Sequence, residues 1–371
     1  METKQQMTVV DEQLKSPESS PLGVGDVQIL KTEITHDRKG HEYTLQHVRV
    51  GDETDIDLDL RNWYNEQGNQ LEQMLRSNPQ WGKTVIEDGK VRISPDNMAA
   101  QWLYFGVDGR PTQLLDWAAK FPTAIALEPM QRLDKGGQWL PGGRPDDRSL
   151  ELYTNMADAI GLRSRARIYS QRLVEYAEDV NVPNINILSL GSGAAIPNIQ
   201  ATQALEAKGR AVNWKFFDFD PEALMFAKKL IDEKDFKYST FNYGPEWENP
   251  ATGQFEPRGQ NYLRAFGEKD ESADVVDALG LWEYLKPQDA VRFAHTLFAK
   301  VKPGGLLIVS NMLPSRPQRE FNERAVGWPG LYLRNDTDLL DIVQQAGIDT
   351  KQVTMTHAED GVYVVMEIKK L

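Results

Sequence analysis

The sequence predicts an α/β fold built on a mostly parallel sheet that ends in an antiparallel hairpin. From residue 185 onward, short apolar runs alternate with segments of helical spacing. This alternation is typical of a parallel, doubly wound sheet covered by helices on both faces. The last two runs are joined at Asp360-Gly361 by a turn that is too short for a parallel crossover, so we expect them to pair antiparallel.

Seven strands are expected in this sheet, at 185–190, 212–218, 236–242, 273–280, 305–312, 351–357 and 362–370. One or two helices over 150–179 precede them and make residues 148–182 a helical lead-in. We therefore assign 148–371 to one domain, with a long connection between its third and fourth strands.

Residues 26–147 are expected to form an α+β accessory domain that packs over the carboxyl edge of the sheet. A hairpin is predicted over 27–34 and 43–50, a helix over 59–78, a second hairpin at 83–94 with an Asp-Gly turn, and helices over 96–106 and 111–121. The loop 133–149, dense in Gly, Pro and Asp, marks the boundary. Residues 1–25 are polar and are predicted to be a disordered tail without a secretory signal.

Composition excludes several classes of function. The net charge of −13 argues against sequence-independent nucleic-acid binding, and the absence of cysteine excludes disulfides, thiolate zinc sites and cysteine nucleophiles. No run of about 18 apolar residues predicts a membrane span, and no histidine or carboxylate spacing predicts a metal site. We expect a cytoplasmic protein, and a homodimer is compatible with this sequence.

The turn after the first strand has the outline of a nucleotide-binding loop. Gly191 and Gly193 stand where that strand ends, and glycine there lets the backbone turn sharply and approach a ligand. Ligands of open α/β sheets bind at this edge. The third glycine of a dinucleotide fingerprint would fall at Ile196, so the turn argues against a nicotinamide or flavin dinucleotide.

Two further strand ends carry candidate ligand contacts. Asp218 closes the second strand, where a carboxylate can accept both hydrogen bonds of a ribose diol, and Phe219 could lie against an adenine ring. Asp220, before Pro221, is expected to cap a helix. Asn242, after the third strand, is a candidate for the adenine edge, with a turn role as the alternative.

These motifs resemble those of class I S-adenosylmethionine-dependent methyltransferases throughout residues 185–371. LSLGSG occupies the place of the family's DxGxGxG motif, and FFDFDPEAL that of its ribose loop. VKPGGLLIVSN matches its LxPGGxL turn before strand five. The resemblance implies S-adenosylmethionine as cofactor, held by Ser189, Gly191, Ser192, Gly193, Asp218, Phe219, Asn242, Gly280 and Leu281.

Two positions depart from the family pattern. Ser189 replaces the acid that often contacts the methionine amino group of the cofactor, and Ala195 replaces the last glycine. Alanine is a mild change there if its φ is negative.

A narrower resemblance concerns the acceptor side. LGLWEYL and SNMLPSRPQREFNERAVGWPGLYLRN are similar to segments of bacterial methyltransferases related to those that make 3-hydroxypalmitic acid methyl ester. The acceptor-side candidates are Trp282, Glu283, Tyr284, Asn311, Arg319, Trp328, Tyr332 and Arg334. The two arginines could pair with an acidic acceptor or form salt bridges within the protein, and the aromatic residues could wall a pocket or join the core.

The resemblance implies methyl transfer to a small-molecule or lipid-like acceptor, at a carboxylate or hydroxyl oxygen. A general base is needed only where the acceptor must lose a proton. Two alternatives stay open: a catalytically degenerate binding or assembly module, and an aminopropyltransferase-like enzyme. A run of arginines at 163, 165 and 167 is expected to be mainly a solvated helix face, although one of them could hold an acidic group.

Overall fold

The computed structural model describes residues 25–52, 58–106, 109–132, 143, 146–259, 262–328 and 330–371. Nearly all of the tail expected over 1–25 and most of the boundary loop expected at 133–149 lie outside these ranges.

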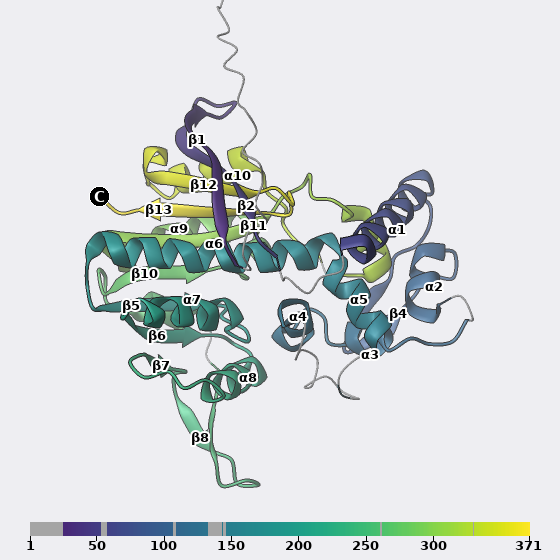
Figure 1. The fold of residues 1–371 in the computed structure, drawn as a ribbon, viewed down its shortest axis with the longest axis horizontal. Helices are drawn as coiled ribbons and strands as arrows, with labels where there is room; N and C mark the ends of the chain where they lie inside the picture. The colour runs from purple at the N-terminus through teal and green to yellow at the C-terminus, as the bar shows by residue number, and fades with distance from the viewer. Residues whose placement is uncertain are drawn as a thin grey trace, which may run out of the picture.

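One sheet of nine strands forms the centre of the molecule, in the order β1-β2-β12-β13-β11-β10-β5-β6-β7 (Figure 1). Strands β11, β10, β5, β6 and β7 pair in parallel, whereas β13 is antiparallel to both β11 and β12. The predicted fold class is therefore confirmed. The seven strands predicted for this sheet are β5 (Asn184–Leu190), β6 (Ala211–Phe217), β7 (Thr240–Asn242), β10 (Ala273–Ala278), β11 (Val301–Met312), β12 (Val353–Ala358) and β13 (Tyr363–Lys369).

The N-terminal hairpin extends this sheet. Strands β1 (Val27–His36) and β2 (Glu42–Val50) form the predicted hairpin, and β2 pairs in parallel with β12. Without β2, one side of β12 would be an open edge with unpaired backbone groups. The sheet therefore draws strands from both ends of the described chain.

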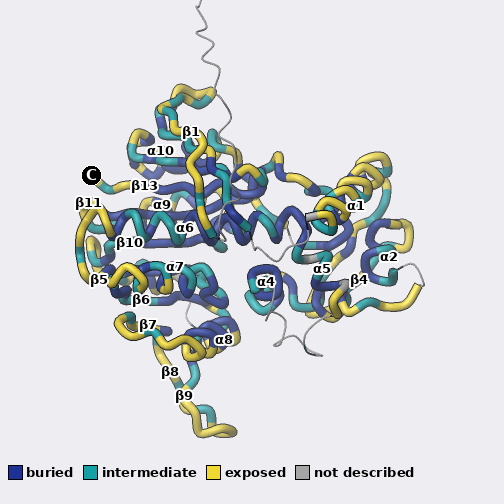
Figure 2. Tube along the Cα trace, in the orientation of Figure 1, coloured by how far each residue is buried: buried dark blue, intermediate teal, exposed yellow. Residues whose placement is uncertain are grey.

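Helices cover both faces of the sheet. On one face lie α6 (Ala157–Val180), α7 (Ile196–Ala207) and α8 (Pro221–Asp232), and on the other lie α9 (Pro287–Lys300) and α10 (Asp336–Gln345). Figure 2 shows the central strands buried and the outer β1 strand exposed. The side chain of Asp220 accepts a hydrogen bond from the backbone of Glu222, which confirms the predicted cap of α8.

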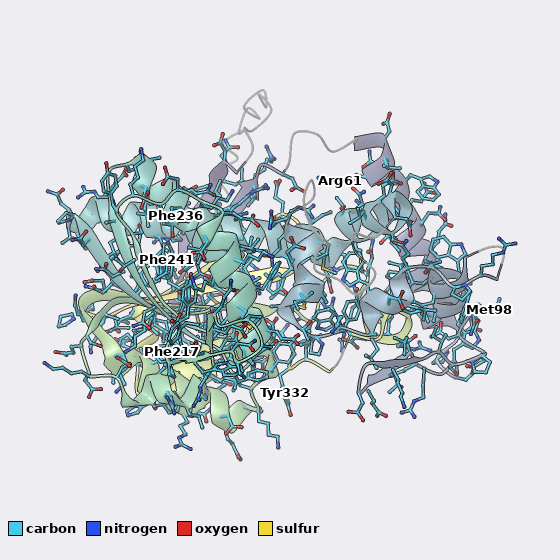
Figure 3. The ribbon with its side chains drawn as sticks, turned by 90° about the horizontal axis from the view of Figure 1, so that it is seen from below. Arg61, Met98, Phe217, Phe236, Phe241 and Tyr332 are labelled. Atoms are coloured by element: carbon cyan, nitrogen blue, oxygen red, sulfur yellow. The ribbon has the colours of Figure 1, made fainter. Side chains whose placement is uncertain are left out.

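A group of helices and one short hairpin, which we call the helical cap, lies at one end of the sheet (Figure 1). Its core includes Met312 at the end of β11 and Tyr363 at the start of β13, so the cap covers the carboxyl edge, as predicted. Figure 3 shows Arg61 and Met98 at the cap end and Phe236 and Phe241 at the sheet end. The cap comprises α1 (Leu58–Ser77), β3 (Val85–Glu87), β4 (Lys90–Arg92), α2 (Met98–Phe105), α3 (Leu114–Ala118), α4 (Ala124–Gln131) and α5 (Asp147–Asn155).

Three features differ from the prediction. The hairpin of β1 and β2, expected within the accessory domain of 26–147, belongs to the main sheet. The helix expected over 111–121 is reduced to α3, and a separate helix, α4, begins after Pro122, because proline disfavours helical backbone in the residue before it. The long connection after β7 contains a hairpin of β8 (Glu246–Glu248) and β9 (Phe255–Pro257). The remaining short helices are η1 (Tyr262–Gly267), η2 (Trp282–Tyr284), η3 (Phe321–Val326) and η4 (Thr350–Gln352).

The close approach of α6 to the start of β13 can be tested at Gly161. A Cβ atom there would lie 2.4 Å from Cβ of Val362. Gly161→Ala should lower the free energy of unfolding by about 1–3 kcal/mol through overpacking. Adding Val362→Gly should recover part of this loss, because it removes the Cβ atom and both methyl groups that the new side chain meets.

Urea denaturation of the full chain measures both effects. Gly267→Ala is the matched control, since a Cβ there meets nothing within 4 Å. Additive losses in the double variant would show that α6 and β13 are not packed in this way.

Candidate cofactor and acceptor site

The glycine turn after β5 is enclosed on two sides. Gly191 and Gly193 have positive φ angles of 61° and 54°. A Cβ atom would lie 3.1 Å from Leu281 Cβ at the first position and 3.2 Å from Ala124 Cβ at the second. Backbone conformation and space thus both require glycine, and the turn lies between α4 of the cap and the segment that follows β10.

Asp218 is bound to this turn. Its Oδ2 accepts a hydrogen bond from the backbone N–H of Gly193 at 2.8 Å, and its Oδ1 accepts one from Asp220 at 3.0 Å. Burial raises the pKa of the Asp218 carboxyl above its ordinary value, while these backbone bonds act in the lowering direction. Each carboxylate oxygen has a second lone pair, so the group can still accept hydrogen bonds from a diol.

Ser192 offers a second polar contact at the turn. Its hydroxyl is buried and has no hydrogen-bond partner among the described residues. Buried polar groups are normally paired, so this hydroxyl and the Asp218 carboxylate fit a ligand rich in hydroxyl or amino groups. Beside them Phe219 is 70% exposed and is available to lie against a flat ring.

The structure explains the serine at 189. Ser189 lies directly opposite Asp277 in the β5–β10 pair, and its hydroxyl donates to Asp277 Oδ1 at 2.7 Å. Tyr169 of α6 donates to Asp277 Oδ2 at 2.6 Å, and Asn198 of α7 donates to the Ser189 hydroxyl at 3.1 Å. All four side chains are buried. The acid that is absent at 189 therefore has a counterpart on the neighbouring strand.

We call Tyr169, Ser189, Asn198 and Asp277 the Asp277 cluster. Its acid, Asp277, has a raised pKa. Burial raises the pKa of Asp277 to about 7, against the lowering effect of the hydrogen bonds from Tyr169 and Ser189. No cation of the described residues contributes to this balance. The cluster joins β5, β10, α6 and α7 directly beneath the glycine turn.

The backbone conformation of Ala195 differs from the one that we expected. We expected alanine to be a mild change with a negative φ, but φ is +53° and the residue is the N-cap of α7. An L-residue in this left-handed conformation costs about 1–2 kcal/mol. The turn is therefore held in a strained form at the position where the family pattern has glycine.

A small cavity of about 40 Å³ lies beside Gly280, at the same edge of the sheet. Apolar side chains from α4, α6, β11 and η3 form much of its wall, together with the aromatic rings of Tyr284, Trp328 and Tyr363. Trp328 Nε1 donates to the Tyr284 hydroxyl at 3.2 Å, which fixes two of these rings. The cavity lies between the cap and the strand ends, at the position where the sequence predicts the acceptor.

Three of the predicted acceptor-side residues line this cavity: Glu283, Tyr284 and Trp328. Trp282 does not line the cavity. It lies in the core on the face of the sheet that α9 and α10 cover. Tyr332 is 40% exposed and contributes its backbone N–H to the carbonyl of Glu283 at 2.7 Å.

The other three predicted polar residues, Asn311, Arg319 and Arg334, do not line the cavity. Arg334 is buried and donates to the carbonyl of Trp282 and to Asn311 Oδ1, each at 3.0 Å, so both side chains support the segment that carries Glu283. Nε of Arg319 donates to Oε1 of Glu323 at 2.9 Å. This arginine therefore forms a salt bridge within the protein, which was the alternative to pairing with an acidic acceptor.

The arginine run on α6 is buried, contrary to the solvated face that we expected. Arg163 forms a two-bond ion pair with Asp52, and Arg167 donates to the carbonyl of Gly51. Arg165 lines the cavity, donates to the carbonyl of Leu279 at 2.9 Å and lies 4.6 Å from the centre of the Tyr363 ring. The cap and the segment after β2 cover this helix face, which the spacing along α6 does not reveal.

Asn242 is the exposed last residue of β7, and its side chain stabilises the turn that follows. Its side-chain oxygen accepts a hydrogen bond from the backbone of Gly244 at 2.8 Å, as in the turn alternative. Its contact with an adenine edge stays a prediction.

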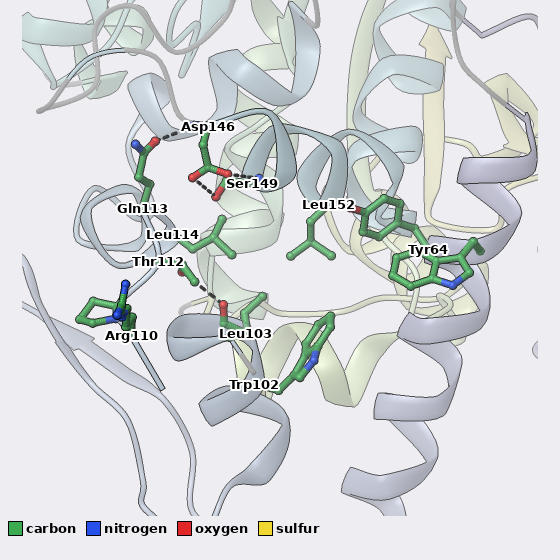
Figure 4. Close-up of a pocket in the computed structure, with 13 residues that line it drawn as sticks. Tyr64, Trp102, Leu103, Arg110, Thr112, Gln113, Leu114, Asp146, Ser149 and Leu152 are labelled. Carbon is green, nitrogen blue, oxygen red and sulfur yellow. Dashed lines mark hydrogen bonds between the residues drawn. The ribbon is translucent and has the colours of Figure 1, made fainter. Parts of the chain in front are cut away.

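A second hollow, of about 350 Å³, lies within the cap and is not part of this site (Figure 4). Its lining includes Tyr64, Trp102 and Leu152, together with Asp146, which caps α5 through Ser149. None of its lining residues belongs to the sheet. Among the residues described, no group of three or more histidine or acidic side chains could hold a metal ion, and no helix has the length and apolar character to cross a membrane.

Comparison with known proteins gives likeness in fold. No protein-family model and no curated protein sequence matches this chain. The crystal structure of a "possible exported protein" from Bordetella parapertussis matches 84% of this chain and 96% of its own, with a TM-score of 0.54 at 15% identity. Magnesium protoporphyrin IX methyltransferase from Synechocystis PCC 6803 with bound S-adenosylhomocysteine matches 59% and 87% (TM-score 0.41, 15% identity). The S-adenosylmethionine-dependent methyltransferase SibL matches 78% and 81% (TM-score 0.41, 16% identity).

These identities support a shared fold and no more. The strand order itself, parallel from β11 to β7 with β13 antiparallel beside β11, is the arrangement that the sequence resemblance predicts. Nothing in these comparisons points to the narrower group that makes 3-hydroxypalmitic acid methyl ester.

The raised pKa of Asp277 predicts a specific pH dependence of stability. The folded state keeps the Asp277 proton at pH values where the unfolded chain has lost it, so stability falls as pH rises from about 4 to about 7. Asp277→Asn lacks this effect. The free energy of unfolding of wild type minus that of the variant should fall by about 1 kcal/mol per pH unit over this window and be level above it. Urea titrations at several pH values measure the difference; a difference independent of pH would contradict the raised pKa.

Exchanging the two cluster residues across the strand pair tests whether one acid is required there. Ser189→Asp should destabilise the protein by on the order of 2 kcal/mol, because it faces Asp277 with a second buried carboxylate. Adding Asp277→Ser restores one acid and one hydroxyl, and should recover part of the melting temperature. A double variant that melts no higher than Ser189→Asp alone would rule out direct coupling of the two positions.

Proposed function

We propose that this protein transfers a methyl group from S-adenosylmethionine to a small-molecule acceptor. The observation that carries the proposal is Asp218, a carboxylate hydrogen-bonded to the glycine turn at the carboxyl end of the sheet. The turn follows β5, where the strand order reverses between β6 on one side and β10 on the other. Ligands of open α/β sheets bind at such a point.

Three residues at the turn would each contact a different part of the cofactor. Asp218 would accept the ribose hydroxyls, Ser192 would bond a polar group of the ligand, and Phe219 would lie against the adenine. When bound, S-adenosylmethionine supplies a methyl group already activated on a positively charged sulfur. The protein then needs to orient the acceptor beside Gly280 and to exclude water. Apolar side chains of the cap, Leu127 and Met130, lie beside Gly280 and would serve the second need.

A second candidate is a binding module that performs no transfer. The close packing of the turn against Ala124 and Leu281 favours it, since these contacts leave the glycine backbone little free space. A cytoplasmic location and a lipid-like acceptor remain part of the first proposal as predictions from the sequence.

Isothermal calorimetry with S-adenosylhomocysteine tests the proposal. Wild type should bind, and Asp218→Ala should bind about 10- to 100-fold more weakly, because two hydrogen bonds to a charged group are lost. Asp220→Ser is the matched control, since it removes a neighbouring charge and keeps a residue able to cap α8. Absence of binding to wild type, or equal binding to wild type and Asp218→Ala, would falsify the cofactor assignment.

A further inference from the structure

The hollow within the helical cap is large enough for a small molecule (Figure 4). Its volume of about 350 Å³ falls in the range of about 300–1,000 Å³ that is typical of small-molecule sites. Its wall comes from α1, α2, α5 and the segment that leads into α3, and the described residues that line it differ from those around the cavity beside Gly280. The hollow is therefore a separate candidate site, which the function proposed above does not use.

Aromatic rings make up much of its apolar wall. Trp63 and Tyr64 are neighbours on α1 and meet edge to face, with their ring centres 4.8 Å apart. The Tyr64 hydroxyl donates to Glu151 of α5 at 3.1 Å, which fixes this ring. Trp102 of α2 lies on the same side of the hollow as Tyr64 (Figure 4), and Trp63 is 48% exposed. A flat ring bound against these side chains would remove further apolar surface from water.

The opposite side of the hollow is polar and open to solvent. Arg110 and Asp146 are the two charged residues among the described residues of the lining, and both are exposed. The Asp146 carboxylate caps α5 by accepting hydrogen bonds from the backbone N–H and the hydroxyl of Ser149, each at 2.9 Å. The backbone N–H of Asp146 donates to Oε1 of Gln113, which lies three residues after Arg110. An acid and an amide are thus held together on the side of the hollow that carries the Arg110 guanidinium (Figure 4).

Both charged groups keep hydrogen-bonding capacity for a ligand. Each carboxylate oxygen of Asp146 has a second lone pair, and a guanidinium has five N–H donors in a planar fork that suits a carboxylate. A ligand that matches this side of the hollow therefore carries one cationic donor and one anionic acceptor close together.

We propose that the hollow binds a free amino acid with an aromatic side chain. The ring packs against the aromatic wall of Trp63, Tyr64 and Trp102. The ammonium group donates to Asp146, and the carboxylate accepts from Arg110. A ligand with only a carboxylate meets Asp146 with a like charge, and a ligand with only an ammonium group meets Arg110 with a like charge. A free amino acid carries both charges on one carbon, whereas a peptide carries them at opposite ends of its chain.

Calorimetry at pH 7 with four probes tests the ligand class. L-Phenylalanine carries the ring and both charges, 3-phenylpropionate lacks the ammonium group, 2-phenylethylammonium lacks the carboxylate, and L-alanine lacks the ring. We expect L-phenylalanine to bind about three- to tenfold more tightly than either singly charged probe, because each of those loses one solvent-exposed ion pair and keeps a repulsive contact. L-Alanine should show no measurable binding, since it lacks the group that contacts the aromatic wall.

Asp146→Asn separates the charge of this residue from its role as a cap. Asparagine caps a helix about as well as aspartate, so α5 stays in place while the negative charge is lost. The variant should bind L-phenylalanine about threefold or more weakly than wild type, and 3-phenylpropionate at least as tightly, because the like charge is gone. Asp147→Asn is the matched control. Asp147 is the next residue and does not line the hollow, so both affinities should keep their wild-type values.

Trp63→Ala tests whether binding takes place in the hollow. The affinities of the three ring-bearing probes should each fall about two- to tenfold, because one of the rings that contacts them is lost. Trp63 is about half exposed, so the fold should tolerate its removal. Met74→Ala is the matched control, since Met74 is 41% exposed on the same helix and does not line the hollow.

Three outcomes would overturn this inference. If no ring-bearing probe binds to wild type, the hollow is not a site for aromatic ligands. If a singly charged probe binds as tightly as L-phenylalanine, or if Asp146→Asn binds L-phenylalanine as wild type does, the ligand is not an amino acid. If Trp63→Ala binds L-phenylalanine as wild type does, binding takes place elsewhere. These measurements need no S-adenosylmethionine, so a failure here leaves the proposed function as it stands.

Discussion

The buried carboxylate of Asp277 is the interaction on which the rest of the site depends. Through Ser189 and Asn198 it is connected to β5 and α7, the two elements that flank the glycine turn, and through Tyr169 it is bonded to α6. Its own strand leads directly into Gly280 and the cavity wall. One polar cluster thus fixes the cofactor turn relative to the cavity beside Gly280. Such a network is rigid because each buried member needs the others to satisfy its hydrogen bonds.

The helical cap gives this edge of the sheet its chemical character. It excludes water from the strand ends, brings apolar side chains such as Leu127 and Met130 over Gly280, and lies against the glycine turn through Ala124. It also buries the α6 face that carries Asp158 and Arg165. Charges held in such an enclosed space act more strongly on one another than they would in water. The raised pKa of Glu283 is a consequence of this enclosure, whereas Asp277 is buried between the sheet, α6 and α7.

Much of the fold could be predicted because its signals are local. Alternating apolar runs predicted the strands, and the Asp360-Gly361 turn predicted the antiparallel end of the sheet. The Asp220-Pro221 pair predicted the start of α8. The site was harder, because its decisive pairings join distant residues: Ser189 and Asp277 are 88 positions apart and meet through strand register alone. The burial of Arg165 and the internal bonds of Arg334 likewise depend on segments far away in the sequence. The positive φ of Ala195 could not be predicted, because alanine does not normally adopt it.

The most direct test of the central claim is a crystal structure of the protein grown with S-adenosylhomocysteine. The account predicts electron density for the ligand between the glycine turn at 191–193 and Asp218, with the ribose hydroxyls within hydrogen-bond distance of that carboxylate. The thioether sulfur should face Gly280 and the cavity that contains Glu283. Density at any other place, or a sulfur directed away from this cavity, would contradict the account.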